Sequence, residues 1–302
     1  MLLCEHESNM KLLNCCSAFA NMSFLSFCLK LLTLSIIILM TMDIKRVYKV
    51  YFSATYTTLK VVDAIAGVMC DNVVDCDVTS QSLAESIEMD RGDVLVIGMP
   101  VYGGRIPECA LQSIAQLNGN GAPAIISCVY GNRDYDDALL ELKNEVEARG
   151  FKIVSASAFI ARHSIFTQIA KDRPSLGDMA EVSQFAIRSK SIIESLDDFS
   201  QLHQIEVKGN TPYKVFNQLP IYPSADEKCV KCGVCASKCP VGAISSENPH
   251  ETDNDKCLAC GRCIVECEVE ARDFRGEFFE ARAAKFKEAF SAPKKNEMYY
   301  AN

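Results

Sequence analysis

The fold of the C-terminal part of this chain is decided by CVKCGVCASKCP (residues 229–240) and CLACGRCIVECE (residues 257–268). Both runs have the spacing C-x2-C-x2-C-x3-C, closed by Pro240 in the first run and by Glu268 in the second. Three thiolates separated by two residues can reach three corners of a cube from one short loop, and Gly233 and Gly261 let backbone N–H groups approach the sulfurs. The spacing therefore predicts two [4Fe–4S] clusters.

In runs of this type the fourth cysteine ligates the other cluster, so the two runs must fold together. Zinc is an alternative, since paired C-x2-C is also zinc spacing. However, zinc takes four ligands, whereas each run here supplies a third close cysteine and then a fourth. A disulfide framework is less favoured still, because such spacing in a cytosolic chain points to metal. We assign one cluster to Cys229, Cys232, Cys235 and Cys267, and the other to Cys257, Cys260, Cys263 and Cys239.

Upstream of the cysteines, strand-like and helix-like stretches alternate. Asp93–Met99 reads DVLVIGM, the continuous apolar run expected of a strand buried in a parallel sheet. The alternation predicts an α/β fold, a doubly wound sheet of five parallel strands. The predicted strands are Val47–Phe52, Val73–Val78, Asp93–Met99, Pro123–Val129 and Phe151–Ile160, and the predicted helices are Thr57–Cys70, Glu108–Leu117, Tyr135–Arg149 and Asp178–Leu196.

The chain divides into five predicted parts. Glycine and proline in residues 206–224 indicate a linker. It separates the α/β domain at 43–205 from a small α+β domain at 225–275 that carries the cysteine runs. Apolar residues at helical spacing predict a C-terminal helix and tail in residues 276–302. Residues 1–42 form an apolar N-terminal extension. The helix positions are Phe279, Ala283, Phe286 and Phe290.

Residues 23–42 are largely apolar and have three interpretations. They are long enough for a membrane helix, which needs about 20 residues. A signal sequence is disfavoured because no A-x-A-like cleavage site follows. The third interpretation is an upstream start, with Met40 or Met42 as the true initiator. We expect a cytoplasmic protein. The alternative is a membrane anchor through residues 23–42, for which Lys45 and Arg46 would keep the main body on the cytoplasmic side.

Composition and charge restrict the partners. The chain has 302 residues, 49% of them hydrophobic, and a formal net charge of −8, which disfavours nucleic-acid binding. Residues 225–275 hold ten acidic and seven Lys or Arg side chains. This balance predicts a redox partner protein with a basic docking surface. Eight further cysteines show no ligand spacing, and we expect free thiols in a reducing compartment.

The loop after the first predicted strand reads SATYTT (residues 53–58). In an open α/β sheet, ligands bind at the carboxyl ends of the strands. Hydroxyls and N–H groups at a helix N-terminus form an anion site there. The loop has no lysine and no G-x-x-x-x-G-K-[ST], which disfavours a nucleoside triphosphate and suits flavin mononucleotide (FMN). Ordinary helix capping by Ser and Thr is the alternative.

Two more loops follow strand ends. Residues 100–107 read PVYGGRIP and residues 130–135 read YGNRDY. Glycine lets backbone N–H groups approach a ring edge, and tyrosine can stack on a flat cofactor. Ordinary turns are the alternative. His163 follows the fifth predicted strand and either lines the flavin, lies on a docking surface or is simply solvated.

These three loops resemble the phosphate loop and the two ring-flanking loops of the flavodoxin fold. With the cysteine runs, the chain resembles the EFR ferrodoxin family, in which a flavodoxin-like domain is fused to a bacterial 2[4Fe–4S] ferredoxin domain. The resemblance covers about residues 46–290, including ARHSIF (residues 161–166) and Arg173-Pro174. It implies that FMN is held at its phosphate by Ser53, Thr55, Thr57 and Thr58, and at its ring by Tyr102, Gly103, Tyr130, Gly131 and Asn132.

One residue departs from the family pattern. Flavodoxins usually carry glycine where this chain has Tyr56. Tyrosine adopts a positive φ only at a cost, so we expect a reshaped loop and weakened flavin binding.

The resemblance implies an electron-transfer iron–sulfur flavoprotein that passes electrons between FMN and two [4Fe–4S] clusters. One alternative is a flavin-dependent reductase of an unknown substrate. The other is a ferredoxin with a flavin-free, flavodoxin-like docking domain. No acid–base pair or activated nucleophile stands out in the sequence, so no catalytic residue is named and enzyme activity stays open.

Overall fold

The computed structural model describes residues 42–196 and 198–301. From Asp43 to Glu194, and again from Asp198 onward, the chain packs as one compact unit that holds both the sheet and the cysteine runs. The apolar segment at residues 23–42 lies outside the described residues, apart from Met42. No helix in the described part of the chain is long and apolar enough to cross a membrane.

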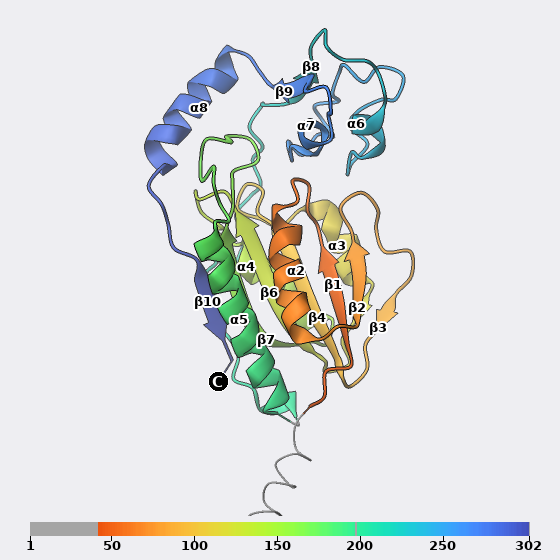
Figure 1. The fold of residues 1–302 in the computed structure, drawn as a ribbon, viewed down its shortest axis with the longest axis vertical. Helices are drawn as coiled ribbons and strands as arrows, with labels where there is room; N and C mark the ends of the chain where they lie inside the picture. The colour runs from red at the N-terminus through yellow and green to blue at the C-terminus, as the bar shows by residue number, and fades with distance from the viewer. Residues whose placement is uncertain (1–41, 197, 302) are drawn as a thin grey trace, which may run out of the picture. The chain divides into compact units, whose positions relative to one another are not determined.

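A six-stranded sheet forms the centre of this unit (Figure 1). Its strand order is β10-β7-β6-β4-β1-β2. All neighbouring pairs are parallel except β10 and β7. Numbered along the chain, the five parallel strands lie in the order 2-1-3-4-5, which is the flavodoxin-like order. The strands are β1 (Arg46–Tyr51), β2 (Val73–Asp77), β4 (Asp93–Pro100), β6 (Pro123–Tyr130), β7 (Lys152–Ile160) and β10 (Glu297–Tyr300).

Helices cover both faces of the sheet, as the alternation predicts. Helices α2 and α5 lie side by side on one face, and α3 and α4 lie on the other (Figure 1). Every residue of β4 and β6 is buried, which explains why these two strands are apolar throughout. The four helices are α2 (Thr57–Met69), α3 (Glu108–Ala115), α4 (Ala138–Ala148) and α5 (Leu176–Glu194).

The sixth strand was not predicted. After the cysteine runs the chain forms α8 (Glu277–Phe290) and then returns to pair β10 antiparallel with β7. The buried Tyr135 ring anchors this return, since its hydroxyl donates to Glu297 at 2.7 Å. Four residues of strand are too few for a period of two to stand out in a sequence.

The C-terminal helix packs through the apolar residues that were predicted from their helical spacing. Phe286 lies 4.5 Å from Phe166 between ring centroids, and Phe279 stacks on the same ring at 5.9 Å. Ala283 is buried in the same cluster. Phe166 belongs to the segment after β7, so α8 is fixed to the loop region above the sheet (Figure 1).

The cysteine runs lie in a small substructure of short elements. Strands β8 (Pro223–Ala225) and β9 (Arg272–Phe274) pair antiparallel, and each run contains one helical turn. Two-residue strands β3 (Ile87–Glu88) and β5 (Leu117–Asn118) form a separate pair, and Phe199–Gln201 is a 3-10 turn. The helical turns are α6 (Val234–Ser237) and α7 (Arg262–Val265).

Residues 210–218, between sheet and cysteine runs, are held at both ends. The buried carboxylate of Asp137 accepts from the N–H groups of Asn210 and Lys214, at 2.8 and 2.6 Å. Further along, the Gln218 amide donates to the carbonyl of Cys257. This segment therefore passes from a ring-flanking loop of the sheet directly to the second cysteine run.

Candidate functional site

The two cysteine runs repeat one backbone conformation. The second residue after the first cysteine has a positive φ in both runs, 56° at Lys231 and 51° at Ala259. The glycines two residues later, Gly233 and Gly261, have φ of 77° and 81° and begin the helical turns α6 and α7. A left-handed residue followed by a left-handed glycine curls each loop, so that its first three cysteines come from one tight arc.

Backbone N–H groups already point at cysteine sulfurs. Ala243 donates to Cys239 Sγ at 3.2 Å, and Ala271 donates to Cys267 Sγ at 3.3 Å. Each donor lies four residues after the fourth cysteine of its run. Hydrogen bonds to sulfur are among the means by which proteins tune iron–sulfur clusters.

The structure brings together four cysteines assigned to one cluster. Cys239, from the first run, lines one small cavity with Cys257, Cys260 and Cys263 from the second. Across the interface between the runs, Cys235 packs with Cys263 in a buried cluster. The two runs therefore lie against each other, and the crossed ligand assignment stays a prediction. For Cys267, the described residues supply one hydrogen bond to the sulfur, from the N–H of Ala271.

A buried guanidinium fits an anionic group beside these thiols. Arg272 is 2% exposed, and its charge lowers the pKa of both Cys235 and Cys263, which burial raises. Two of its nitrogens bond to the carbonyls of Pro249 and Pro223, but its Nε has no partner among the described atoms. An unpaired buried donor beside cysteines of both runs suits clusters that carry negative charge.

Burial keeps the thiols protonated when no iron is bound. It raises the pKa of Cys260 to about 12 and that of Cys263 to about 11. Iron binds the thiolate, so cluster assembly must release these protons. The donor set of eight cysteines, N–H groups aimed at sulfur and a buried cation fits iron–sulfur clusters.

The phosphate loop follows β1 and leads into α2. Ser53 is buried, and its hydroxyl accepts from the N–H of Leu59 at 2.9 Å, so this side chain caps the helix. Thr58 is buried as well. The half-buried hydroxyls of Thr55 and Thr57 lie 3.4 Å apart and line a small hollow with Arg162. Together with the first N–H groups of α2, they form the part of the loop that is available to an anion.

Tyr56 adopts the strained conformation that its position demands. Its φ is 63°, in the left-handed region, so the loop keeps the backbone shape that glycine normally provides. The ring is covered by the guanidinium of Arg262 at 4.6 Å, and the hydroxyl donates to Glu266. The expected reshaping of the loop is therefore not seen at Tyr56, whereas the expected strain is present and contacts from the second cysteine run offset it.

Arg262 also forms hydrogen bonds to the backbone of the phosphate loop. This side chain is 5% exposed, and its Nη1 donates to the carbonyls of Ser53 and Ala54, each at 3.3 Å. It forms an ion pair with Glu266 at 3.3 Å. Since Arg262 lies between Cys260 and Cys263, the second run is joined to the phosphate loop by charge-assisted contacts.

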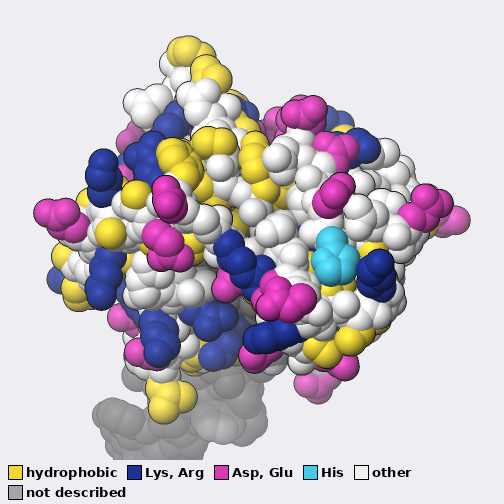
Figure 2. All heavy atoms as spheres, turned by 90° about the horizontal axis from the view of Figure 1, so that it is seen from above, with side chains coloured by type: hydrophobic (Ala, Val, Ile, Leu, Met, Phe, Trp, Pro, Cys, Tyr) yellow, Lys and Arg dark blue, Asp and Glu magenta, His cyan; other side chains and the backbone are white. Residues whose placement is uncertain are grey.

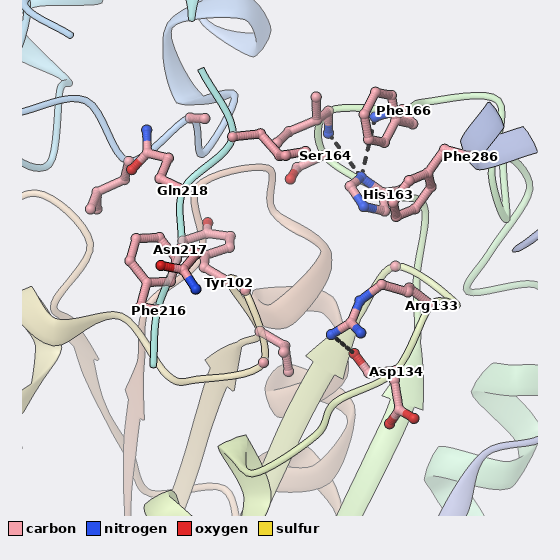
Figure 3. A pocket seen from close by; sticks show the side chains of 18 of the residues that line it. Tyr102, Arg133, Asp134, His163, Ser164, Phe166, Phe216, Asn217, Gln218 and Phe286 are labelled. Carbon is pink, nitrogen blue, oxygen red and sulfur yellow. Dashed lines mark hydrogen bonds between the residues drawn. The ribbon is translucent and has the colours of Figure 1, made fainter. Parts of the chain in front are cut away.

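A cavity of about 290 Å³ lies where the ring of a flavin is expected (Figure 3). Tyr102, Phe216 and Asn217 form one side, and His163 and Arg133 face them from the other. Of the predicted ring residues, Tyr102, Gly103 and Gly131 line this cavity. Leu258 and Ala259, from the second cysteine run, line it as well.

The other two predicted ring residues, Tyr130 and Asn132, do not line this cavity. Tyr130 lines the hollow of the phosphate loop instead, and it is 4% exposed and packs edge-on against Tyr135, with ring centroids 5.4 Å apart. Asn132 is buried, and its amide donates to the carbonyls of Phe290 and Ala292 at 2.7 and 2.9 Å. Its carbonyl accepts from the N–H of Lys294. The side chain of Asn132 thus holds the segment between α8 and β10.

His163 is half-buried and lines the cavity. Its Nδ1 accepts from the N–H groups of Ile165 and Phe166 at 3.1 and 3.2 Å. Burial, with a smaller effect from the charge of Arg133, lowers its pKa to about 4. The ring is therefore neutral near pH 7, and with Nδ1 as acceptor its proton is on Nε2. His163 packs so closely on Gly131 that a Cβ there would lie 2.7 Å from its ring.

Three site residues were not identified from the sequence. Arg162 and Arg262 supply the cations that the phosphate loop itself lacks, and Phe216 covers Gly103 from the linker. Arg162 and Arg262 occur within the quoted segments ARHSIF and CLACGRCIVECE. Nothing in a linker predicts that one phenylalanine will cover a loop more than one hundred residues away.

Comparison with known proteins adds a family for one part of the chain. The 4Fe-4S dicluster domain family matches residues 209–272. No curated protein matches the chain.

Several solved structures resemble the first half. An archaeal flavodoxin is 13% identical, with 49% of this chain and 98% of that chain covered and a TM-score of 0.35. A Fusobacterium nucleatum flavodoxin bound to FMN is 14% identical, covering 48% and 97%, with a TM-score of 0.35. An apo NADH:FMN oxidoreductase is 13% identical, covering 50% and 91%, with a TM-score of 0.37.

Strand order and family match together define the class of protein. The first part is a flavodoxin-like α/β domain, and a 4Fe–4S ferredoxin-type domain follows it. The chain is an iron–sulfur protein of the electron-transfer type.

Proposed function

We propose that this chain passes electrons between FMN, bound at the flavodoxin-like domain, and two [4Fe–4S] clusters bound by the crossed cysteine sets. Bound flavin exchanges one or two electrons and each cluster exchanges one, so the combination converts between paired and single electrons. The residues of the chain hold these groups close together. The cluster thiolates need a reducing compartment, and we place the protein in the cytoplasm.

The observation that carries this proposal is the contact between the second cysteine run and the flavin loops. Leu258 and Ala259 lie between two cluster ligands and line the same cavity as Tyr102. A Cβ on Gly261 would lie 3.3 Å from the Ser164 carbonyl and 3.5 Å from Thr55 Cγ2. One short loop therefore touches both the ring cavity and the phosphate loop.

The size of the cavity favours electron transfer over substrate reduction. Ligand pockets commonly measure about 300–1,000 Å³, and this one, at about 290 Å³, is just below that range. A reductase would need space for a substrate beside the flavin ring. Phe216 and the Leu258–Ala259 segment line the cavity, so the chain itself takes up part of the space beside the ring.

The proposal is tested by cofactor content. After anaerobic reconstitution, we expect about eight iron per chain and saturable binding of one FMN, followed by flavin fluorescence. Gly131→Ala should weaken FMN binding at least tenfold without changing the iron content, because its Cβ would push His163 into the cavity. The matched control is Gly67→Ala, where a Cβ meets nothing within 4 Å. Iron binding without any FMN binding would leave a ferredoxin with a flavin-free domain.

A further inference from the structure

Charge is distributed unevenly along the sequence of the ferredoxin-type domain. Lys228, just before the first cysteine run, and Lys231 and Lys238 within it are exposed, and residues 227–238 contain one acidic side chain, Glu227. The neighbouring Asp226 pairs with Arg275 at 2.9 Å. By contrast, residues 245–255 hold four acids and no Lys or Arg, and residues 266–273 hold four acids and only a buried arginine. The domain as a whole is negatively charged, but residues 227–238 form a basic loop within it.

The basic loop is also the exposed edge of the cluster-binding fold. Cys232 is exposed, whereas Cys257, Cys260 and Cys263 of the second run are buried. Val230 and Val234, on either side of Cys232, are 66% and 38% exposed. The second run lines the flavin cavity, whereas the first run has exposed lysine side chains and bonds to the α/β domain through the Lys238 carbonyl, which accepts from the Ser80 hydroxyl at 3.2 Å. The first run is therefore the part of the cluster-binding fold that can meet another molecule.

Figure 2 looks onto this end of the molecule and shows hydrophobic, basic and acidic side chains interspersed over it. The charge that a partner meets at a docking surface is therefore decided by the residues of that surface and not by the net charge of the domain. Two exposed valines in a segment with three exposed lysines match the usual pattern of an apolar centre and a charged rim.

We propose that residues 227–238 are the docking surface for an acidic one-electron redox protein. The inference rests on the proposed function, in which this loop is the outer end of the electron path. The negative net charge of the domain predicts a basic partner. However, the lysines in the loop around Cys232 favour a partner whose contact surface is acidic. In each encounter, one electron leaves the chain and the partner is reduced by one electron. The lysine side chains would attract the acidic partner electrostatically, and salt would screen this attraction.

Two cytochromes of opposite charge test the proposal: acidic cytochrome b5 and basic cytochrome c. Equilibrium binding is measured by titration, and the rate of cytochrome reduction is measured after the clusters are reduced with dithionite and the excess dithionite is removed. At low salt we expect the acidic cytochrome to bind the cluster-loaded protein, and affinity and rate to fall at least tenfold in 0.5 M salt. The basic cytochrome should bind more weakly.

The variant Lys228→Glu/Lys238→Glu should weaken the acidic cytochrome at least tenfold and strengthen the basic one. Lys231 is left unchanged because of its left-handed backbone. The control, Lys285→Glu/Lys287→Glu, places the same charge change on exposed positions of α8 and should alter neither cytochrome. Equal effects of the two double variants, or no effect of the first, would overturn the proposal. Dithionite makes the test independent of flavin, so a failure to bind FMN would count against the proposed function alone.

Discussion

Tyr56 joins the two parts of the site through one side chain. A left-handed tyrosine costs roughly 1–2 kcal/mol relative to glycine. The Arg262 guanidinium over its ring contributes about 0.5–1 kcal/mol, and the bond to Glu266 adds to it. Strain and stabilisation are thus of similar size, and the stabilisation exists only while the second cysteine run is folded.

Substitutions at Tyr56 separate these two contributions. Tyr56→Gly removes both strain and contacts, and FMN affinity should stay within about threefold of the natural chain. Tyr56→Ala keeps the strain but loses the contacts, so it should weaken FMN binding by about 1–2 kcal/mol, roughly tenfold. Fluorescence titration with FMN measures both variants. A large gain in affinity for Tyr56→Gly would show that the contacts stabilise nothing.

Arg162 is the exposed cation in the hollow of the phosphate loop. Arg162→Gln should weaken FMN binding about tenfold and leave riboflavin binding unchanged, because riboflavin lacks the phosphate. The control is Lys171→Gln, an exposed cation outside that hollow. Equal losses for FMN and riboflavin would show that Arg162 acts through the fold and does not contact phosphate.

His163 makes stability depend on pH. Its folded pKa, about 4, is below the unfolded value near 6.5, so the unfolded chain binds the extra proton first. The stabilisation is complete above pH 6.5 and falls as the pH drops toward 4, by about 2 kcal/mol at pH 5. His163→Asn should flatten this part of the stability profile, as followed by circular dichroism during thermal unfolding. Profiles that run parallel from pH 7 to pH 5 would contradict the assignment of a neutral histidine whose pKa is lowered in the folded chain.

The sequence predicts site residues well where spacing is local. The cysteine runs, Tyr102, Gly103 and Gly131 need only a motif or the end of a strand to be located. Asn132 is different, since its side chain is bonded to backbone about 160 residues away. No local pattern reveals such a partner.

At the level of elements, β10 ties the C-terminal segment to the sheet. Strand β10 lies beside β7, and Asn132 holds the segment that leads into it from α8. The five parallel strands and the four helices around them follow from apolar periodicity. The sixth strand depends on its fit to the free edge of β7, which only the folded sheet provides.

Removing the Asn132 amide should weaken the attachment of the segment between α8 and β10 to the rest of the fold. Asn132→Ala leaves two carbonyls and one N–H without their partner, and should lower stability by about 1–3 kcal/mol. Limited proteolysis should then cut faster within residues 290–296, while the iron content stays unchanged. The control is Asn254→Ala, an exposed asparagine in the loop before the second run. Equal protease resistance in Asn132→Ala and the natural chain would mean that β10 alone holds the segment.

At the scale of the whole molecule, two domains of different fold share one buried site. Arg262 and Glu266 reach the phosphate loop from the second cysteine run, and Gln218 bonds to that run from the linker. The sequence predicts both domains and the order in which they occur. It does not predict that the second run, and not the first, faces the flavin loops, because that choice depends on packing across about 200 residues.

The central claim is that flavin and clusters on one chain exchange electrons. The most direct measurement delivers single electrons by flash photolysis to anaerobic protein loaded with FMN and iron, and follows the flavin and cluster absorbance over time. We predict one phase in which the two absorbances change together, at a rate that does not depend on protein concentration. A rate proportional to protein concentration, or no exchange with both cofactors bound, would contradict the account.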